Sequence, residues 1–159
     1  ELVDRYWLLR GEALLGLGRQ EDAVAAYAKL DGTPLAAEGW NGKGRVAATR
    51  LQWRYAAANF QQAVQSEPAN PDFLNNLAFA GMHLGKCEAS AATLRQAYEL
   101  KPGSDLIRNN LIIALTLAGD RTGAETVLQT VTDAQQREQV KRLVASVIKD
   151  NNLSKDGQS

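Results

Sequence analysis

The sequence has very few of the side chains that build disulfides, metal centres and covalent active sites. Its 159 residues include one cysteine, one histidine and one methionine. A disulfide needs two cysteines, and a structural zinc-type site needs about four ligands. These shortages exclude an internal disulfide and a Cys/His metal centre, and we expect no cofactor.

The single histidine and the single cysteine, His83 and Cys87, lie four residues apart. On one helical face such a pair would serve as a nucleophile with its base, or as half of a metal site. Gly85 between them predicts a break in the helix, so the spacing does not place them on one face. We favour a partly buried thiol and a histidine that lines a surface groove, and we do not expect an enzyme.

An excess of one charge and a long apolar run are also missing. The 18 basic and 18 acidic side chains balance to a net charge of +0. Nucleic-acid binders usually carry a basic excess, and a membrane-spanning helix needs about 20 apolar residues, so neither class is expected. The chain opens at Glu1 without a methionine. We expect a processed or trimmed piece, with any targeting segment or lipid-bearing cysteine upstream.

What the sequence does contain is an internal repeat with a period of about 34 residues. Trp7 and Trp40 have the same separation in the chain as Gly11 and Gly44. Further along, the step from Ala63 to Ala97 equals the step from Pro68 to Pro102. A fixed period of this size is typical of stacked supersecondary units that bury a continuous core.

Residues 37–70 carry the fullest copy of the repeat, with Trp40, Gly44, Ala56-x3-Phe60, Ala63 and Pro68. This pattern resembles the tetratricopeptide repeat, which follows W-x2-L-G-x2-Y, A-x3-F and P. The other copies cover residues 3–36, 71–104 and 105–133.

The resemblance implies an all-α fold, a right-handed superhelical solenoid of about four helix pairs plus a C-terminal capping helix. We expect one domain over residues 1–150, with the capping helix at 134–149, and a flexible tail at 151–159. Apolar spacing and glycine positions predict helices near residues 3–17, 20–30, 34–50, 53–66, 71–84, 87–99, 105–118, 121–132 and 134–149.

Two kinds of residue mark the predicted helix ends. Gly18, Gly85 and Gly119 each follow an apolar run, where a left-handed residue closes a helix. Asn70, before Pro71, and Ser104 are predicted to cap the starts of the fifth and seventh helices.

In the tetratricopeptide family the first helix of each pair lines the concave face, which binds a protein or peptide partner. The family phase predicts that this groove is lined by Asn41, Arg45, Asn75, Asn76, Phe79, Met82, His83, Asn109, Asn110 and Ile113. Family members often use such an asparagine to bind partner backbone, because an amide offers both a donor and an acceptor. The alternative is that the asparagine doublets are solvated or satisfy neighbouring helices.

Chaperone-binding members of the family hold a carboxylate terminus with Lys, Asn and Arg residues on consecutive first helices. Here the first helix carries Leu8 and Glu12 on its inner side, so this clamp pattern is not met. A C-terminal carboxylate is therefore not the expected ligand.

The third and fourth copies resemble the tetratricopeptide lipoproteins, called TadD, of the bacterial tight-adherence (Flp) pilus system. The likeness lies in the phrase that begins at Asn75-Asn76-Leu77-Ala78 and recurs at Asn109. It implies a periplasmic protein held at the outer membrane by an upstream lipid, acting as a pilotin or assembly factor for a secretin. A general adaptor of another cell-envelope or chaperone complex, or an accessory domain of a larger enzyme, remain alternatives.

Overall fold

The structure is a computed structural model that describes residues 1–156. Over these residues it is entirely helical, without strands. The helices are α1 (Leu2–Gly16), α2 (Gln20–Ala28), α3 (Ala36–Thr49), α4 (Trp53–Ser66), α5 (Pro71–His83), α6 (Cys87–Leu100), α7 (Asp105–Leu117), α8 (Arg121–Leu128) and α9 (Ala134–Asp156).

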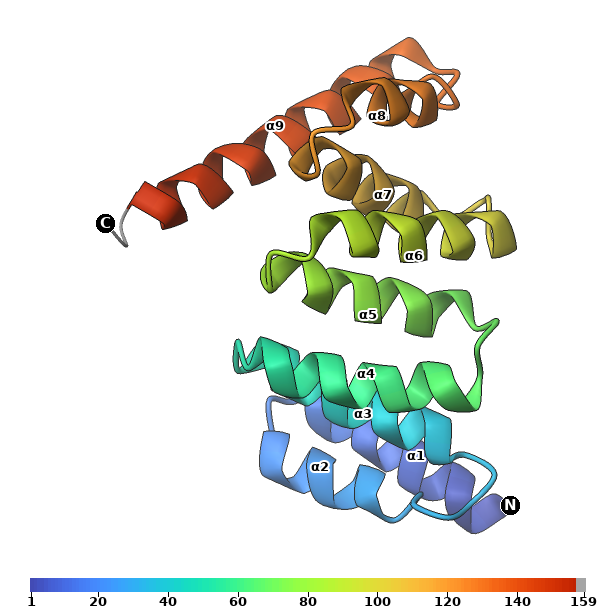
Figure 1. The fold of residues 1–159 in the computed structure, drawn as a ribbon. Coiled ribbons are helices and arrows are strands. Elements are labelled where there is room, and N and C mark those ends of the chain that lie inside the picture. The colour runs from blue at the N-terminus through green and yellow to red at the C-terminus, as the bar shows by residue number, and fades with distance from the viewer. Residues whose placement is uncertain (157–159) are drawn as a thin grey trace.

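Successive helices pack as pairs that stack in chain order. The helices α1 to α8 form four pairs, and the second helix of each of the first three pairs also contacts the first helix of the next. Figure 1 shows this stack running from α1 at one end to α7 and α8 at the other. The predicted helix-pair solenoid with a C-terminal helix is confirmed.

Two helix boundaries differ from the prediction. α8 ends at Leu128, four residues early. α9 continues to Asp156 instead of ending at 149, although residues 151–159 were predicted to be flexible. The segment after Asp150 lacks an apolar period, but it also lacks proline and glycine before Gly157, so nothing in it stops a helix. Residues 157–159 lie outside the described residues.

Each first helix of the four pairs ends in the same left-handed turn. Gly18, Gly85 and Gly119 have φ of 73°, 77° and 85°, as predicted. In the second repeat the equivalent residue is Leu51, which takes φ 59° without being glycine. In all four turns the next backbone N–H donates to the carbonyl five residues back, for example from Gln52 to Ala47 at 2.9 Å. This is the hydrogen bond of a Schellman cap.

The predicted N-caps are also present. The Asn70 side chain accepts hydrogen bonds from the N–H groups of Asp72 and Phe73. Ser104 accepts from the Ile107 N–H at 3.2 Å. These bonds satisfy donors that have no partner within the helix.

Glycines on the first helices let aromatic rings of the second helices approach the backbone closely. The Tyr27 ring of α2 lies between Gly11 of α1 and Gly42 of α3, and a Cβ at either glycine would overlap it. The Phe60 ring occupies the same place against Gly44. Tyr27 is fully buried and Phe60 nearly so, which makes these rings the centres of the first two repeats.

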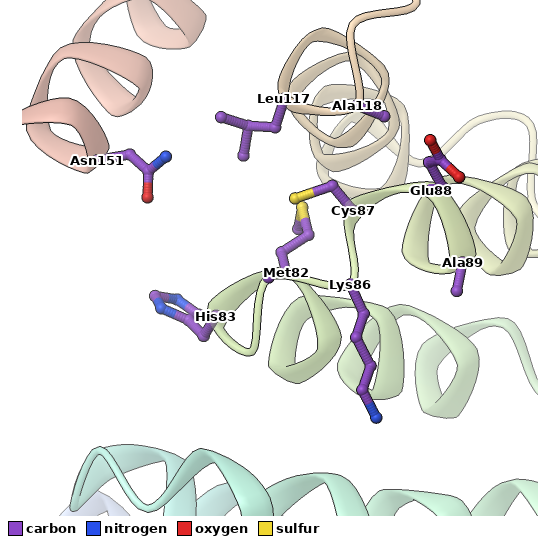
Figure 2. A pocket seen from close by; sticks show the side chains of 10 residues that line it. Met82, His83, Lys86, Cys87, Glu88, Ala89, Leu117, Ala118 and Asn151 are labelled. Carbon is purple, nitrogen blue, oxygen red and sulfur yellow. The ribbon is translucent and has the colours of Figure 1, made fainter. Parts of the chain in front are cut away.

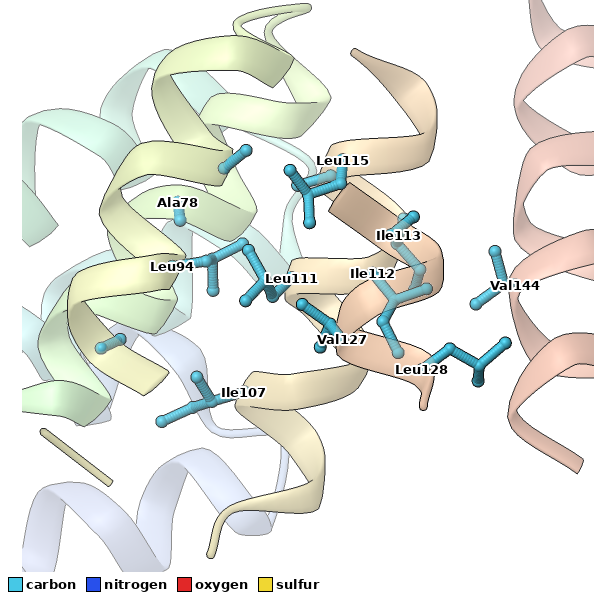
Figure 3. Close-up of a cluster of buried hydrophobic side chains, with 14 of the residues drawn as sticks. Ala78, Leu94, Ile107, Leu111, Ile112, Ile113, Leu115, Val127, Leu128 and Val144 are labelled. Atoms are coloured by element: carbon cyan, nitrogen blue, oxygen red, sulfur yellow. The ribbon is translucent and has the colours of Figure 1, made fainter. Parts of the chain in front are cut away.

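The largest core cluster lies at the C-terminal end of the solenoid. It includes Leu94 of α6, Leu111 of α7 and Val127 of α8 (Figure 3). Val140 and Val144 of α9 join this cluster. α9 therefore packs on α7 with its apolar stripe and closes the end of the core.

Candidate partner-binding groove

The inner side chains of the first two repeats bind one another. Arg45 of α3 donates to both carboxylate oxygens of Glu12 in α1, at 2.7 and 2.8 Å. The Tyr27 hydroxyl donates to the same carboxylate at 3.0 Å. Burial, followed by the charge of Glu12, raises the pKa of Tyr27 above its ordinary value. Arg45, a predicted groove residue, therefore has its charge balanced by a neighbouring helix.

Two further polar contacts join neighbouring first helices. Asn76 of α5 donates from its side-chain nitrogen to Asn41 of α3, at 2.8 Å. Both side chains are half-buried, so they reach the inner surface while holding each other. Asn110 of α7 donates in the same way to Asn75 of α5, at 2.9 Å.

Three of the predicted groove residues do not line the groove. Asn75 is 5% exposed and Asn110 9%, and their polar groups are used in the contact between α5 and α7. Ile113, at 7% exposed, belongs to the core cluster near α9. The helix-joining alternative is therefore correct for these asparagines, because α7 packs against α5 closely enough to exclude water from their amides.

Asn109 is half-buried and also has a partner on its own helix. Its side-chain oxygen accepts from the Arg108 guanidinium at 3.2 and 3.1 Å. The doublets thus split, with one member of each pointing inward and the other partly open to solvent.

The most distinctive inner surface is an aromatic cluster around α5. His83 stacks flat on Trp53, with ring centroids 3.7 Å apart and an interplanar angle of 2°. Phe79 meets both rings edge-on, at 5.7 Å from Trp53 and 4.8 Å from His83. Phe79 remains 38% exposed, so the cluster presents an aromatic edge to the solvent.

A pocket of about 700 Å³ adjoins this cluster. Met82 and His83 form one side of it, Cys87 and Leu117 another, and Asn151 of α9 lies across from them (Figure 2). Met82 is half-buried, and its flexible thioether adapts to neighbours of varied shape. The pocket thus combines one aromatic, one thioether and one thiol with few charges.

The titration of His83 follows from its surroundings. Burial lowers the pKa of the imidazole from its ordinary value, because the charged form is poorly solvated against Trp53. At neutral pH His83 is therefore uncharged. α5 ends at His83 and α6 begins at Cys87, and Gly85 turns the chain between them, as predicted. Across residues 1–156, no three His, Cys, Asp or Glu side chains gather to hold a metal ion.

Sequence reasoning missed one member of the site. Trp53 begins α4, a second helix, and was interpreted as a packing anchor rather than a surface residue. It comes next to the groove because the end of α5 passes beside the start of α4. A tryptophan at the N-terminus of a second helix was the only signal in the sequence.

Comparison with protein families decides what this stack of helix pairs is. Three family models described as tetratricopeptide repeat match residues 4–32, 41–105 and 84–147. The chain is a tetratricopeptide repeat protein. No curated protein sequence matches it closely enough to count as a relative.

Solved structures of other tetratricopeptide repeat proteins share the fold. YrrB, described as having an unusual peptide-binding site, is 23% identical, with a TM-score of 0.70 over 79% of this chain and 66% of its own. TTC0263 of Thermus thermophilus is 19% identical, with a TM-score of 0.70 over 91% and 82%. The O-GlcNAc transferase of Thermobaculum terrenum is 18% identical, with a TM-score of 0.68 over 91% of this chain but 26% of its own.

Membrane insertion has no support among the helices. None of those that the structure describes has both the length and the apolar character needed to cross a bilayer.

Proposed function

We propose that this tetratricopeptide repeat protein is a non-enzymatic scaffold that binds a segment of a partner protein on the inner face of α3, α5 and α7. The observation that carries this is the uncovered aromatic edge of Phe79 beside the pocket of Met82 and His83. Exposed aromatic and methionine side chains of this kind are typical of protein interfaces.

The charges on the inner face favour an apolar partner segment. Arg45 is balanced by Glu12, and Asn41 by Asn76, so the polar groups at that end are already engaged. His83 is uncharged at neutral pH because burial lowers its pKa. A partner helix or strand that presents aliphatic side chains to Phe79 and Met82 fits this face better than an acidic peptide does.

The biological role that we propose is assembly of a tight-adherence (Flp) pilus, with the protein acting as a pilotin for the secretin. Support comes from the likeness of the Asn75–Ala78 and Asn109 phrases to the lipoproteins of that system. On this proposal the protein is periplasmic, and a lipid upstream of Glu1 holds it at the outer membrane. The partner segment would belong to the secretin or another pilus component.

Two other roles would use the same face. One is a general adaptor in another cell-envelope or chaperone complex. The other is an accessory domain of an enzyme, a role for which the partial overlap with the O-GlcNAc transferase is a precedent in fold. The length of the gene separates this second role, because a catalytic domain adds well over one hundred residues.

Site-specific photo-crosslinking in the cells that make the protein tests the proposal. A photoreactive residue at Phe79 is compared with one at Tyr55, which is 73% exposed on α4. We expect a crosslink to a secretin or pilus component from position 79 and none from position 55. Equal crosslinking from both positions would contradict the groove, and a partner of another system would contradict the pilus role.

A further inference from the structure

The outer face of α1 carries an uncovered apolar stripe at the N-terminal end of the stack (Figure 1). Leu2, Tyr6, Leu9 and Leu17 are 85%, 51%, 69% and 74% exposed, and Ala13 is also exposed between them. Their spacing of three or four residues places them on one side of the helix. The end faces of a solenoid are normally polar, so this stripe marks a surface that another element covers.

The internal repeat shows what kind of element fits there. One repeat later, the positions of Leu9 and Ala13 are Gly42 and Val46 of α3, which are buried against α2. The position of Leu17 is Arg50, which binds Gln20 and Glu21 of α2. The stripe is thus the surface on which a second-type helix lies in the following repeat.

The sizes along the stripe match α5 more closely than α3. Tyr6 corresponds to Gly39 of α3 and to Phe73 of α5, two repeats on. In the structure Phe73 packs with Ala63 of α4. A helix on α1 should therefore present a small residue to Tyr6.

The other end of the stripe continues this match. Ala13 corresponds to Ala80 of α5, which packs with Phe60 of α4. A helix on α1 should present a large residue to Ala13, so α4 has the complementary order of side chains.

The repeat also indicates a charge on the occupant. Arg10 is the equivalent of Lys43, and each cation lies over a tryptophan, Trp7 or Trp40. Lys43 in addition binds Asp31, which follows α2, at 2.8 Å. A helix placed on α1 as α2 lies on α3 would bring a carboxylate to Arg10.

We propose that the stripe is a docking site for an amphipathic helix of another polypeptide. That helix has a small residue for Tyr6, a large one for Ala13 and a carboxylate near its C-terminal end for Arg10. A second copy of this chain fits less well. Antiparallel pairing of two α1 helices about the middle of the stripe brings the two Arg10 side chains together.

A helical peptide with the sequence of residues 53–70, constrained by a lactam bridge on its outward side, serves as the probe. It carries Phe60 and Ala63 in the order that α1 requires. We expect saturable binding by fluorescence anisotropy, at least tenfold weaker for Leu9→Glu and unchanged for Phe79→Glu on the inner face. An Ala63→Trp peptide should bind at least tenfold more weakly, and Arg10→Gln should weaken binding about threefold.

Absence of binding, or equal binding by Leu9→Glu, would overturn the docking site without affecting the groove. Unchanged binding by Arg10→Gln would overturn the carboxylate. Light scattering should find a monomer, and a dimer that Leu9→Glu dissociates would assign the stripe to a second copy. Binding to residues 1–159 but not to the protein as its gene encodes it would assign the stripe to the same polypeptide.

Discussion

At the scale of single residues, the repeat makes exceptions easy to recognise. Leu51 is the clearest, because three equivalent positions are glycine and all four share the left-handed turn. A side chain with a Cβ is strained in this region by about 1–2 kcal/mol. Nothing in the sequence around Leu51 marks it as the glycine position except its place one repeat after Gly18.

We predict that Leu51→Gly stabilises the protein, by about 1 kcal/mol in the free energy of unfolding, because it relieves this strain. The side chain is 71% exposed, so little packing is lost. Urea denaturation measures the change. Leu17→Gly is the matched control, since Leu17 is 74% exposed at a helix end with an ordinary φ of −84°. Equal effects of the two substitutions would contradict the assignment of strain.

The asparagine doublets give a second prediction. Asn110→Ala should destabilise by about 1–3 kcal/mol, because it leaves the buried Asn75 oxygen without its donor. Asn109→Ala, at a half-buried position, should change stability by about 0.5 kcal/mol or less. Thermal denaturation of both variants checks this, and a loss as small for Asn110 as for Asn109 would contradict the buried pair.

His83 should make the stability depend on pH. Burial places its folded pKa below the ordinary value of 6.5, so the unfolded chain binds more protons between the two values. The contribution is therefore complete above pH 6.5 and is lost as the pH falls through the window below it. We expect Tm to drop from pH 7 to pH 5 more in the parent protein than in His83→Gln. Parallel curves would contradict a buried, neutral imidazole.

At the scale of helices, the contact between Tyr27 and two glycines connects the first repeat to the second. Sequence reasoning placed Gly11 and Gly44 at close helix contacts, and the structure shows both under rings. It did not single out Gly42, since the family signature has no glycine there. The reason is local, because Tyr27 reaches across to the next repeat as well as to its own.

Gly42→Ala should therefore destabilise by about 1–3 kcal/mol, since its Cβ would overlap the Tyr27 ring. Gly16→Ala is the control, because a Cβ there meets nothing within 4 Å and alanine favours the helix. Chemical denaturation compares the two. A Gly42→Ala variant as stable as Gly16→Ala would mean that α2 and α3 are farther apart than described.

At the scale of the whole molecule, the internal period of the sequence was sufficient to predict the order, type and pairing of the helices. Repetition makes this possible, because each pair contacts only its neighbours and four copies constrain one phase. The groove was less predictable. Family phase selected the inner side of each first helix, but it could not separate Asn76 from the buried Asn75.

The missing information was the rotation and spacing between neighbouring pairs. That geometry buries Ile113 near α9 and brings Trp53 beside His83, although the latter two belong to different helix pairs. Neither contact lies within one repeat, so no single copy of the signature contains it.

The central claim is that the inner face beside Phe79 and Met82 binds the partner. The most direct measurement is isothermal titration calorimetry, with the protein captured by crosslinking as the titrant. Phe79→Glu is compared with Tyr55→Glu, which changes an exposed aromatic on α4. We predict affinity at least tenfold weaker for Phe79→Glu and unchanged for Tyr55→Glu, with helicity retained in both. Full affinity of the Phe79→Glu protein would contradict the claim.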